Sequence, residues 1–218
     1  MRTRPPPMLF GLERSVYTRI ARLALEEKAV LYSLQEVEIF GPEGVPKEHF
    51  ERHPFGRIPV LKHGALSLYE TSAITRYVDE AFPGAALQPT SPSQRARMNQ
   101  VIGLLDSYAY RPMVWGIFVQ RVRVPLSGGT PDESQIANSL QSSATCLRAL
   151  EALLSTAPFF AGGAISLADL HAFPMIRYLC LAPEGLALFR RHQALLRWYE
   201  EMLKRPSAST TASRYEQA

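Results

Sequence analysis

The chain has 218 residues, of which 46% are hydrophobic and 20% are charged. That much apolar side-chain mass can offset the entropy lost on ordering, which excludes a disordered chain. The 24 basic residues exceed the 20 acidic ones by four, but they are scattered along the sequence. Because nucleic-acid binding requires clustered basic residues, we expect no nucleic-acid partner.

No segment resembles a membrane span or a secretory signal. The longest uncharged stretch, residues 152–168, contains a proline and two glycines, whereas a span needs about 20 predominantly apolar residues. The basic residues at the amino end lead into prolines and not into an apolar run. Cys146 and Cys180 are 34 positions apart, which fits neither a Cys-x-x-Cys motif nor a pair of metal ligands. We therefore expect a cytoplasmic protein with no membrane contact and no metal.

The first eighty residues alternate between strand-like and helix-like patterns. Apolar residues repeat at three- and four-residue spacing after Ser15, which is well placed to cap a helix. Two apolar runs separated by a glycine-containing gap predict a β-hairpin. The order is β-α-β-α-β-β-α, which is typical of a small α/β layer structure. The expected elements are a strand at 8–10, a helix at 15–28, a strand at 31–40, a short helix at 47–52, a hairpin of 58–61 with 66–69, and a helix at 71–82.

The second half of the chain shows no convincing strand pattern. Residues 87–92 look like a linker, because two prolines and two hydroxyl residues fall in six positions. We therefore predict two domains, an α/β domain at 7–84 and an all-α domain at 92–210. The expected helices are at about 93–120, 133–155, 167–182 and 192–205, with breaks at 125–131, 158–163 and 183–185.

Four sequence segments together resemble one family. The stretch from Glu70 to Tyr77, Glu-Thr-Ser-Ala-Ile-Thr-Arg-Tyr, resembles the Glu-Ser-x-Ala-Ile segment of cytosolic glutathione transferases. Residues 54–61 are similar to the family's Asn-Pro-x-Gly-x-x-Pro-x-Leu segment. Residues 15–25 look like its first helix in serine-type members, and residues 161–170 look like its helix-six capping segment. The four occur in the family's order, and the phi and tau classes and related bacterial members look most similar.

The resemblance implies the glutathione transferase architecture, an α/β thioredoxin-like domain followed by an all-α helical domain. The first would bind glutathione as the co-substrate, and the second would contribute the site of a hydrophobic electrophile. The implied activity is transfer of the glutathione thiolate to an electrophilic carbon, as in detoxification. No metal is implied.

The resemblance assigns glutathione contacts to Ile58, Glu70 and Thr71. Glutathione carries an ammonium that needs an acid, and Glu70 supplies a negative charge. Thr71 offers a hydroxyl and a backbone N–H at a helix start, where the helix dipole favours a carboxylate. Pro59 matches the family's cis-proline, which would turn the backbone of Ile58 outward to pair with the cysteinyl part of glutathione. The alternative is that these residues only begin a helix and a strand.

Ser15 is the expected catalytic residue. Its hydroxyl lies at the amino end of a predicted helix and can donate a hydrogen bond to the sulfur of bound glutathione. The alternative is that Ser15 only caps the helix, and Tyr17 is a rival hydroxyl. Because residue 15 is not cysteine, the family's thiol-transferase branch is not expected.

One departure from the family pattern concerns the basic residue that would bind the glycyl carboxylate of glutathione. Related sequences place a basic residue near positions that are Gly44 and Val45 here. Lys47 or Arg57 could replace it, although Lys47 could equally be a solvated helix residue. His53 stands where the family has asparagine and is expected only to cap or solvate a turn.

The electrophile is expected between the domains, against Leu12 and the helix at 93–120. The aromatic side chains of that helix are those of Tyr108, Tyr110, Trp115 and Phe118, which suit an apolar cleft. Helical spacing alone does not separate a cleft wall from a core, so both interpretations remain for each residue.

We therefore predict a serine-type glutathione S-transferase that forms a homodimer. Two alternatives remain open. One is a binding module without enzymatic activity on the same fold, for a ligand or a partner protein, and the other is a glutathione-dependent isomerase or peroxidase. The usual Ser-Ser-Cys opening of such isomerases is absent, since residues 15–17 are Ser-Val-Tyr. No motif identifies the electrophile.

Overall fold

A computed structural model describes residues 5–216 and divides the chain into two compact units. The first unit runs to Leu87 and also includes the segment from Pro206 onward, and the second spans Gln88–Arg205. Within residues 5–216, no helix has the length and apolar character that crossing a bilayer requires.

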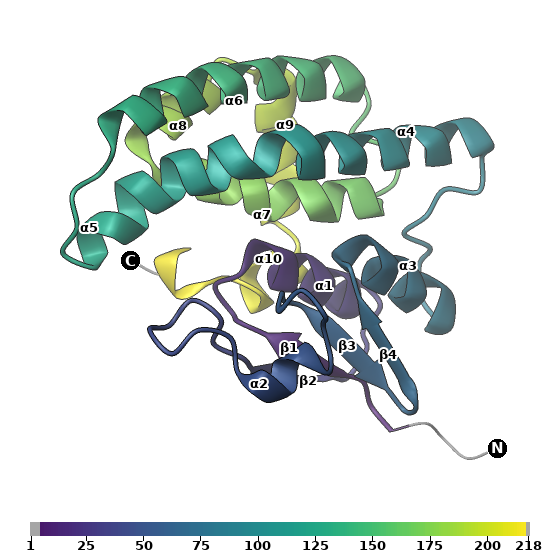
Figure 1. Cartoon of the computed structure of the whole chain (residues 1–218). Coiled ribbons are helices and arrows are strands. Elements are labelled where there is room, and N and C mark those ends of the chain that lie inside the picture. Colours follow the sequence, from purple (N-terminus) through teal and green to yellow (C-terminus); the bar gives the residue numbers. More distant parts are fainter. Residues whose placement is uncertain (1–4, 217–218) are drawn as a thin grey trace. The chain divides into compact units, whose positions relative to one another are not determined.

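The first unit is a four-stranded mixed sheet with helices packed on it (Figure 1). The strand order is β2-β1-β3-β4, with β1 parallel to β2 and β3 antiparallel to both β1 and β4. This confirms the predicted α/β thioredoxin-like fold. Its elements are β1 (Met8–Gly11), α1 (Val16–Glu27), β2 (Ser33–Glu36), α2 (Lys47–Phe50), β3 (Val60–His63), β4 (Leu66–Tyr69), α3 (Thr71–Ala81), α10 (Pro206–Thr210) and the 3₁₀ turn η3 (Arg214–Glu216).

Strand β2 is shorter than the apolar pattern predicts. The expected strand covered residues 31–40, but pairing with β1 extends only over Ser33–Glu36. The chain turns away soon afterwards, because the carboxylate of Glu38 accepts a hydrogen bond from the backbone N–H of Phe40 at 2.8 Å. Leu31, at the other end, is 84% exposed and precedes the paired segment.

The end of the described chain packs on helix α1 of the first unit. Arg19 is 1% exposed, and its guanidinium forms an ion pair with Glu216 and donates to the carbonyl of Ala208 at 3.1 Å. Thr211 accepts a further hydrogen bond from Arg19 Nε at 3.3 Å. Residues 206–210 were expected in the helical domain, but these buried contacts place them in the α/β unit.

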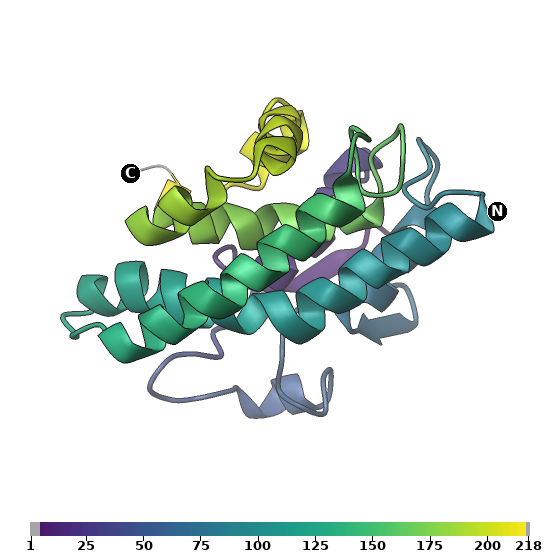
Figure 2. The ribbon, with the colours of Figure 1, turned by 90° about the horizontal axis from the view of Figure 1, so that it is seen from above.

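The second unit is entirely helical, which confirms the predicted all-α half. In both views α6 runs alongside the long helix that begins with α4 (Figure 2). Its elements are α4 (Pro92–Leu104), the π-helical segments η1 (Leu105–Ala109) and η2 (Arg111–Arg123), α5 (Val124–Leu126), α6 (Glu133–Leu154), α7 (Leu167–Leu181), α8 (Pro183–Phe189) and α9 (Gln193–Leu203).

The helix predicted at 93–120 continues to Leu126 and has wider turns over much of its length. A π-helix closes i→i+5 hydrogen bonds, so residues five apart come to the same side. Trp115 Nε1–H accordingly donates to the hydroxyl of Tyr110 at 3.0 Å. Gly116 lies against α6, where an added Cβ would be 1.9 Å from the hydroxyl oxygen of Ser139. The close approach of the two helices thus requires glycine.

Asp169 organises the interior of the helical unit. Its carboxylate is fully buried and accepts hydrogen bonds from Ser166 N–H at 2.8 Å, Phe160 N–H at 3.0 Å and Trp198 Nε1–H at 2.9 Å. The predicted reciprocal cap of Ser166 and Asp169 at the start of α7 is therefore confirmed. Burial raises the pKa of Asp169, and the hydrogen bonds from Phe160, Ser166 and Trp198 oppose that shift.

Replacing Glu216 with glutamine should destabilise the protein by about 3–5 kcal/mol, because the change breaks a buried ion pair by removing the charge of one partner. Denaturant unfolding of both proteins measures the difference. The matched control is Glu201→Gln, which removes an ion pair with Lys204 whose side chains are 52% and 67% exposed, and it should leave the midpoint unchanged. Equal midpoints for all three proteins would contradict the structural role of the buried pair.

Candidate functional site

The sheet register gathers three of the predicted site segments at one edge. Phe10 of β1 pairs with Val60 of β3, and Val60 pairs with Tyr69 of β4. Since β3 is antiparallel to both neighbours, the end of β1, the beginning of β3 and the end of β4 lie side by side. The turns that hold Ser15, Ile58 and Glu70 therefore leave the sheet at the same edge.

Ser15 caps helix α1, as predicted, and its hydroxyl proton remains available to donate a hydrogen bond. Its backbone is extended, at φ −81° and ψ 129°, and its Oγ accepts from the backbone N–H of Thr18 at 3.3 Å. A hydroxyl has one donor and two acceptor lone pairs, so accepting this bond leaves its proton available. The side chain is half-buried at the positive end of the helix dipole, where an anion is favoured.

A close contact between β1 and α1 determines where Ser15 lies. A Cβ added at Gly11 would be 2.4 Å from the Thr18 hydroxyl oxygen, so the strand end and the first helical turn touch. The carbonyl of Leu12 accepts from the backbone N–H of Ser15 at 3.0 Å and closes the turn between them. Leu12 itself is 2% exposed.

The Ile58–Pro59 peptide bond is cis, as the resemblance implied. The side chain of Ile58 belongs to a buried apolar cluster with Phe10, Leu12, Val37 and Val60. Among the described residues, the backbone N–H and C=O of Ile58 form no backbone hydrogen bond. The strand edge at Ile58 can therefore pair with an extended peptide.

Glu70 and Thr71 form the junction between β4 and α3. Glu70 has φ +70°, a conformation that costs a non-glycine residue about 1–3 kcal/mol and that clusters at functional sites. Its carbonyl accepts from Ile74 N–H at 3.0 Å and starts the helix, while its exposed carboxylate makes no capping hydrogen bond. Thr71 is the first residue of α3. The Glu70 carboxylate can pair with the ammonium of an α-amino acid group, and the N-terminus of α3 can bind the carboxylate of the same group.

Lys47 and Arg57 are both exposed, in α2 and in the turn that precedes Ile58. Among the described residues, neither side chain forms an ion pair. Both cations are therefore available to a carboxylate.

Two buried histidines behind this edge were not expected in the site. His49 is fully buried, and its Nε2–H donates to the carbonyl of Arg57 at 2.7 Å. His53 is 2% exposed, and its Nδ1 accepts from Phe55 N–H at 3.3 Å. The departure from asparagine at residue 53 is the one signal in the sequence, and by itself it predicts only a turn residue.

The predicted electrophile residues have very different exposures. Tyr108 is 69% exposed and Trp115 is 36% exposed. Phe118 is 1% exposed, and its ring stacks on that of Tyr178 with the centroids 4.1 Å apart. Phe118 and Leu12 thus pack within their own units, since Leu12 belongs to the cluster around Ile58. Tyr110 is half-buried, so Tyr108 and Trp115 are the predicted residues with exposed side chains.

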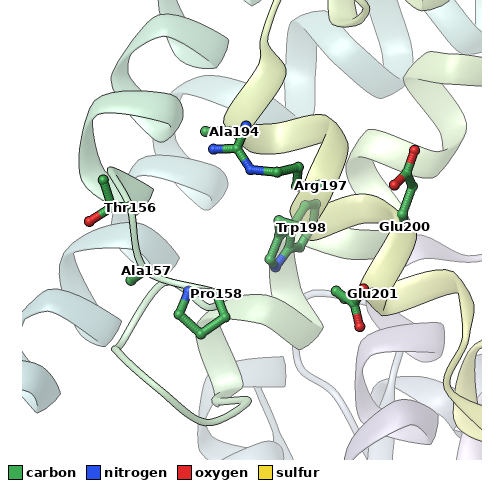
Figure 3. A pocket seen from close by; sticks show the side chains of 8 residues that line it. All are labelled: Thr156, Ala157, Pro158, Ala194, Arg197, Trp198, Glu200 and Glu201. Carbon is green, nitrogen blue, oxygen red and sulfur yellow. The ribbon is translucent and has the colours of Figure 1, made fainter.

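A hollow of about 440 Å³ lies in the helical unit beside α9 (Figure 3). Charged side chains of Arg197, Glu200 and Glu201 line it, with Pro158 on the opposite side. It contains none of the residues predicted to bind glutathione or the electrophile. Among residues 5–216, no group of three or more histidine, cysteine, aspartate or glutamate side chains is arranged to hold a metal ion.

Comparisons with known proteins match both halves of the chain to one family. The profile described as Glutathione S-transferase, N-terminal domain matches residues 9–86, and the one described as Glutathione S-transferase, C-terminal domain matches residues 121–201. The curated Glutathione S-transferase 4 of Zea mays is 30% identical over 213 residues, which cover 95% of this chain and 92% of the relative.

Solved structures of similar fold contain glutathione or its conjugates. Glutathione S-transferase I from maize, in complex with an atrazine glutathione conjugate, aligns with a TM-score of 0.82 at 27% identity and covers 95% of this chain and 96% of its own. The theta-class enzyme from Xanthomonas axonopodis pv. citri, with glutathione bound, aligns with a TM-score of 0.80 at 26% identity. The alignment covers 97% of this chain and 99% of that enzyme's chain.

Proposed function

The chain belongs to the glutathione S-transferase family, and from this premise we propose that it transfers the thiolate of glutathione to hydrophobic electrophiles, with Ser15 as the catalytic hydroxyl. The observation that carries the proposal is the single sheet edge at which Ser15, Ile58 and Glu70 come together.

Each part of glutathione has a complementary group at this edge. The ammonium of its γ-glutamyl residue pairs with the carboxylate of Glu70, and the neighbouring carboxylate accepts from the first turn of α3 at Thr71. The cysteinyl backbone pairs with the N–H and C=O of Ile58. Lys47 or Arg57 holds the glycyl carboxylate.

The Ser15 hydroxyl and the dipole of α1 stabilise the thiolate. Lowering a thiol pKa by about two units, from roughly 8.5, requires about 2.7 kcal/mol. A hydrogen bond to a charged acceptor contributes roughly 1.5–3 kcal/mol and a helix terminus roughly 0.3–1 kcal/mol. These two effects are sufficient without a dedicated base, and the thiolate then attacks the electrophilic carbon.

Exposed aromatic side chains of the helical unit supply the apolar surface for the electrophile. Tyr108 and Trp115 are the exposed members of the predicted set, and the Tyr110 hydroxyl fixes the indole of Trp115 by accepting its N–H. Apolar surface with few polar groups suits a hydrophobic electrophile. The maize relative that carries an atrazine glutathione conjugate supports this class of substrate.

The protein acts as a homodimer. An exposed aromatic patch in the α/β unit, formed by Phe50, Phe55 and Tyr69, supports this assignment. The rings of Phe55 and Tyr69 both lie beside His53, with centroids 6.1 and 4.7 Å from it, so these two members of the patch are neighbours. Contiguous exposed apolar surface is typical of protein interfaces. We place the dimer in the cytoplasm, in keeping with two buried, unpaired cysteines.

A binding module without enzymatic activity on the same fold is the alternative that the site itself allows. It would retain the contacts of Glu70, Thr71 and Ile58 with glutathione but would not lower the thiol pKa. Conjugation of glutathione to an activated chloronitrobenzene distinguishes the two, because the binding module would form no product above the uncatalysed rate.

Replacing Ser15 with alanine should lower turnover by about 10-fold or more, since one hydrogen bond to the thiolate contributes 1.5–3 kcal/mol. Glutathione affinity should change little. The measurement is the ultraviolet absorbance of the bound thiolate as a function of pH, in which the thiol pKa of the variant should rise toward that of free glutathione.

Asp132→Ala is the matched control for loss of a helix cap. Asp132 caps α6 by accepting from Gln135 N–H at 2.9 Å, so both substitutions remove a cap. The control should keep the thiol pKa and the turnover of the unmodified protein. An unchanged thiol pKa in Ser15→Ala would remove Ser15 from the mechanism.

Replacing Glu70 with glutamine should weaken glutathione binding roughly 10- to 100-fold, because the change keeps the shape but removes the charge opposite the ammonium. The loss should appear in affinity more than in turnover, since the ammonium is held equally in ground and transition states. A glutathione analogue that lacks the amino group should bind both proteins alike. Calorimetric titration of both ligands into both proteins completes the cycle, and an equal loss for both ligands would mean that Glu70 only shapes the helix start.

Replacing Phe55 with serine should shift the protein from dimer to monomer, because its ring is 71% exposed in the isolated chain and would be covered by a second copy. Light scattering at micromolar concentration measures the mass. Leu31→Ser, which alters a leucine that is 84% exposed outside the aromatic patch, should leave the dimer intact. A monomeric mass for the unmodified protein would end the proposal.

A further inference from the structure

His49 connects α2 with the segment that presents Ile58. Its ring is fully buried, and Nε2–H donates to the Arg57 carbonyl at 2.7 Å. A carbonyl can only accept, so Nε2 carries the proton. The other ring nitrogen, Nδ1, is buried without a hydrogen-bond partner. The hydrogen bond from Nε2 ties α2 to the backbone of Arg57, the residue immediately before Ile58.

His53 closes the turn between His49 and Arg57. Its backbone N–H donates to the His49 carbonyl at 2.9 Å, and its own carbonyl accepts from Gly56 N–H at 2.9 Å. Its Nδ1 accepts from Phe55 N–H at 3.3 Å, so Nδ1 must be unprotonated. Protonation of this nitrogen would remove the acceptor from the turn.

Three other groups act electrostatically on the pKa of His53. Glu70, at the start of α3, favours its protonated form, while Arg57 and His49 oppose it. Burial has the largest effect and lowers the pKa of His53 below its ordinary value of about 6.5. Tyr69 and Phe55 cover the ring with centroids at 4.7 and 6.1 Å. Burial therefore favours the neutral form of His53, which is the form that can accept the hydrogen bond from Phe55 N–H.

We propose that His53, supported by His49, is a positioning residue for glutathione: its neutral ring holds the turn that presents the backbone of Ile58, so acidification releases the turn and weakens binding. The inference rests on the proposed function, because it assigns the Ile58 backbone to glutathione.

Glutathione binding and the charge of His53 are linked through Glu70. An ammonium beside Glu70 neutralises the carboxylate that favours protonated His53, so bound glutathione favours the neutral ring. Linkage is reciprocal, and neutral His53 must therefore favour glutathione by the same factor. The pKa of His53 is lower in the folded protein than in the unfolded chain. The stabilisation that its neutral ring provides is therefore complete above the pKa of the unfolded chain, and it is lost as the pH falls through the pKa of the folded protein.

Replacing His53 with asparagine separates its role as a hydrogen-bond acceptor from its ability to gain a proton. Its side-chain oxygen can accept from the N–H two residues ahead, as in an Asx turn, and it does not titrate. Leucine fills space but offers no acceptor. His53→Asn should therefore keep the turn at every pH, and His53→Leu should lose it at every pH.

The test is calorimetric titration of S-methylglutathione between pH 5.5 and 7.5, since its sulfur carries no proton. The unmodified protein should bind about 3- to 10-fold more weakly at the acid end, as expected for one lost hydrogen bond. His53→Asn should bind with a pH-independent affinity close to the neutral value, and His53→Leu should be uniformly weak. With saturating glutathione at pH 7.5, kcat should remain within about twofold in both variants, because the turn acts on binding.

His63→Asn is the matched control. His63 is another buried histidine of the same unit, but its Nδ1 lies 2.7 Å from the hydroxyl of Tyr77 and not in this turn. The control should keep the acid-side loss of affinity. Light scattering and circular dichroism establish that each variant keeps its mass and fold, and if His53→Leu does not fold, the pH dependence of His53→Asn decides alone.

Two results would overturn the inference. One is an acid-side loss in His53→Asn equal to that of the unmodified protein, which would assign the titration to another group. The other is neutral-pH affinity in a folded His53→Leu equal to that of the unmodified protein, which would show that the turn does not position Ile58. Failure of the unmodified protein to bind glutathione at pH 7.5 would instead overturn the proposed function, and the inference with it.

Discussion

Antiparallel pairing of β3 with both β1 and β4 is the constraint on which the site depends. Because Val60 lies opposite Phe10 on one side and Tyr69 on the other, three chain ends meet at one edge of the sheet. A shift of one residue in either register would turn the side chains of β3 to the opposite face. The buried cluster that contains Phe10, Ile58 and Val60 would then lose its packing, and this packing makes the register specific.

The groups that recognise glutathione in the proposed mechanism lie at the ends of regular elements. Helix starts and strand edges have backbone groups without hydrogen-bond partners inside the element, and a ligand can supply these partners. Ser15 accepts from its own helix and can still donate to sulfur, while Glu70 starts α3 with its carbonyl and keeps its carboxylate for an ammonium. The buried imidazole of His53 adds to this edge an element that responds to pH, because its turn requires the neutral ring.

Features that depend on neighbours within a few positions were predictable from the sequence. The Ser15 cap, the hairpin of β3 and β4, the start of α3 at Thr71 and the reciprocal cap of Ser166 and Asp169 each involve residues at most four positions apart or a short turn. Their patterns also form the motifs that resemble the glutathione transferases, which is why the fold, the family and the predicted site segments could all be obtained from sequence.

The sequence by itself determined the two-domain plan, the family and the local turns that carry Ser15, Ile58 and Glu70. Contacts between distant residues were decided by the tertiary structure alone: Arg19 meets Glu216 across 197 positions, and Phe118 stacks on Tyr178 although its helical spacing fitted a binding surface equally well. The role of His53 was also out of reach, because it depends on burial and on the charge of Glu70 from another element. Periodicity shows which residues share a face but not what that face meets, since the partner comes from elsewhere in the chain.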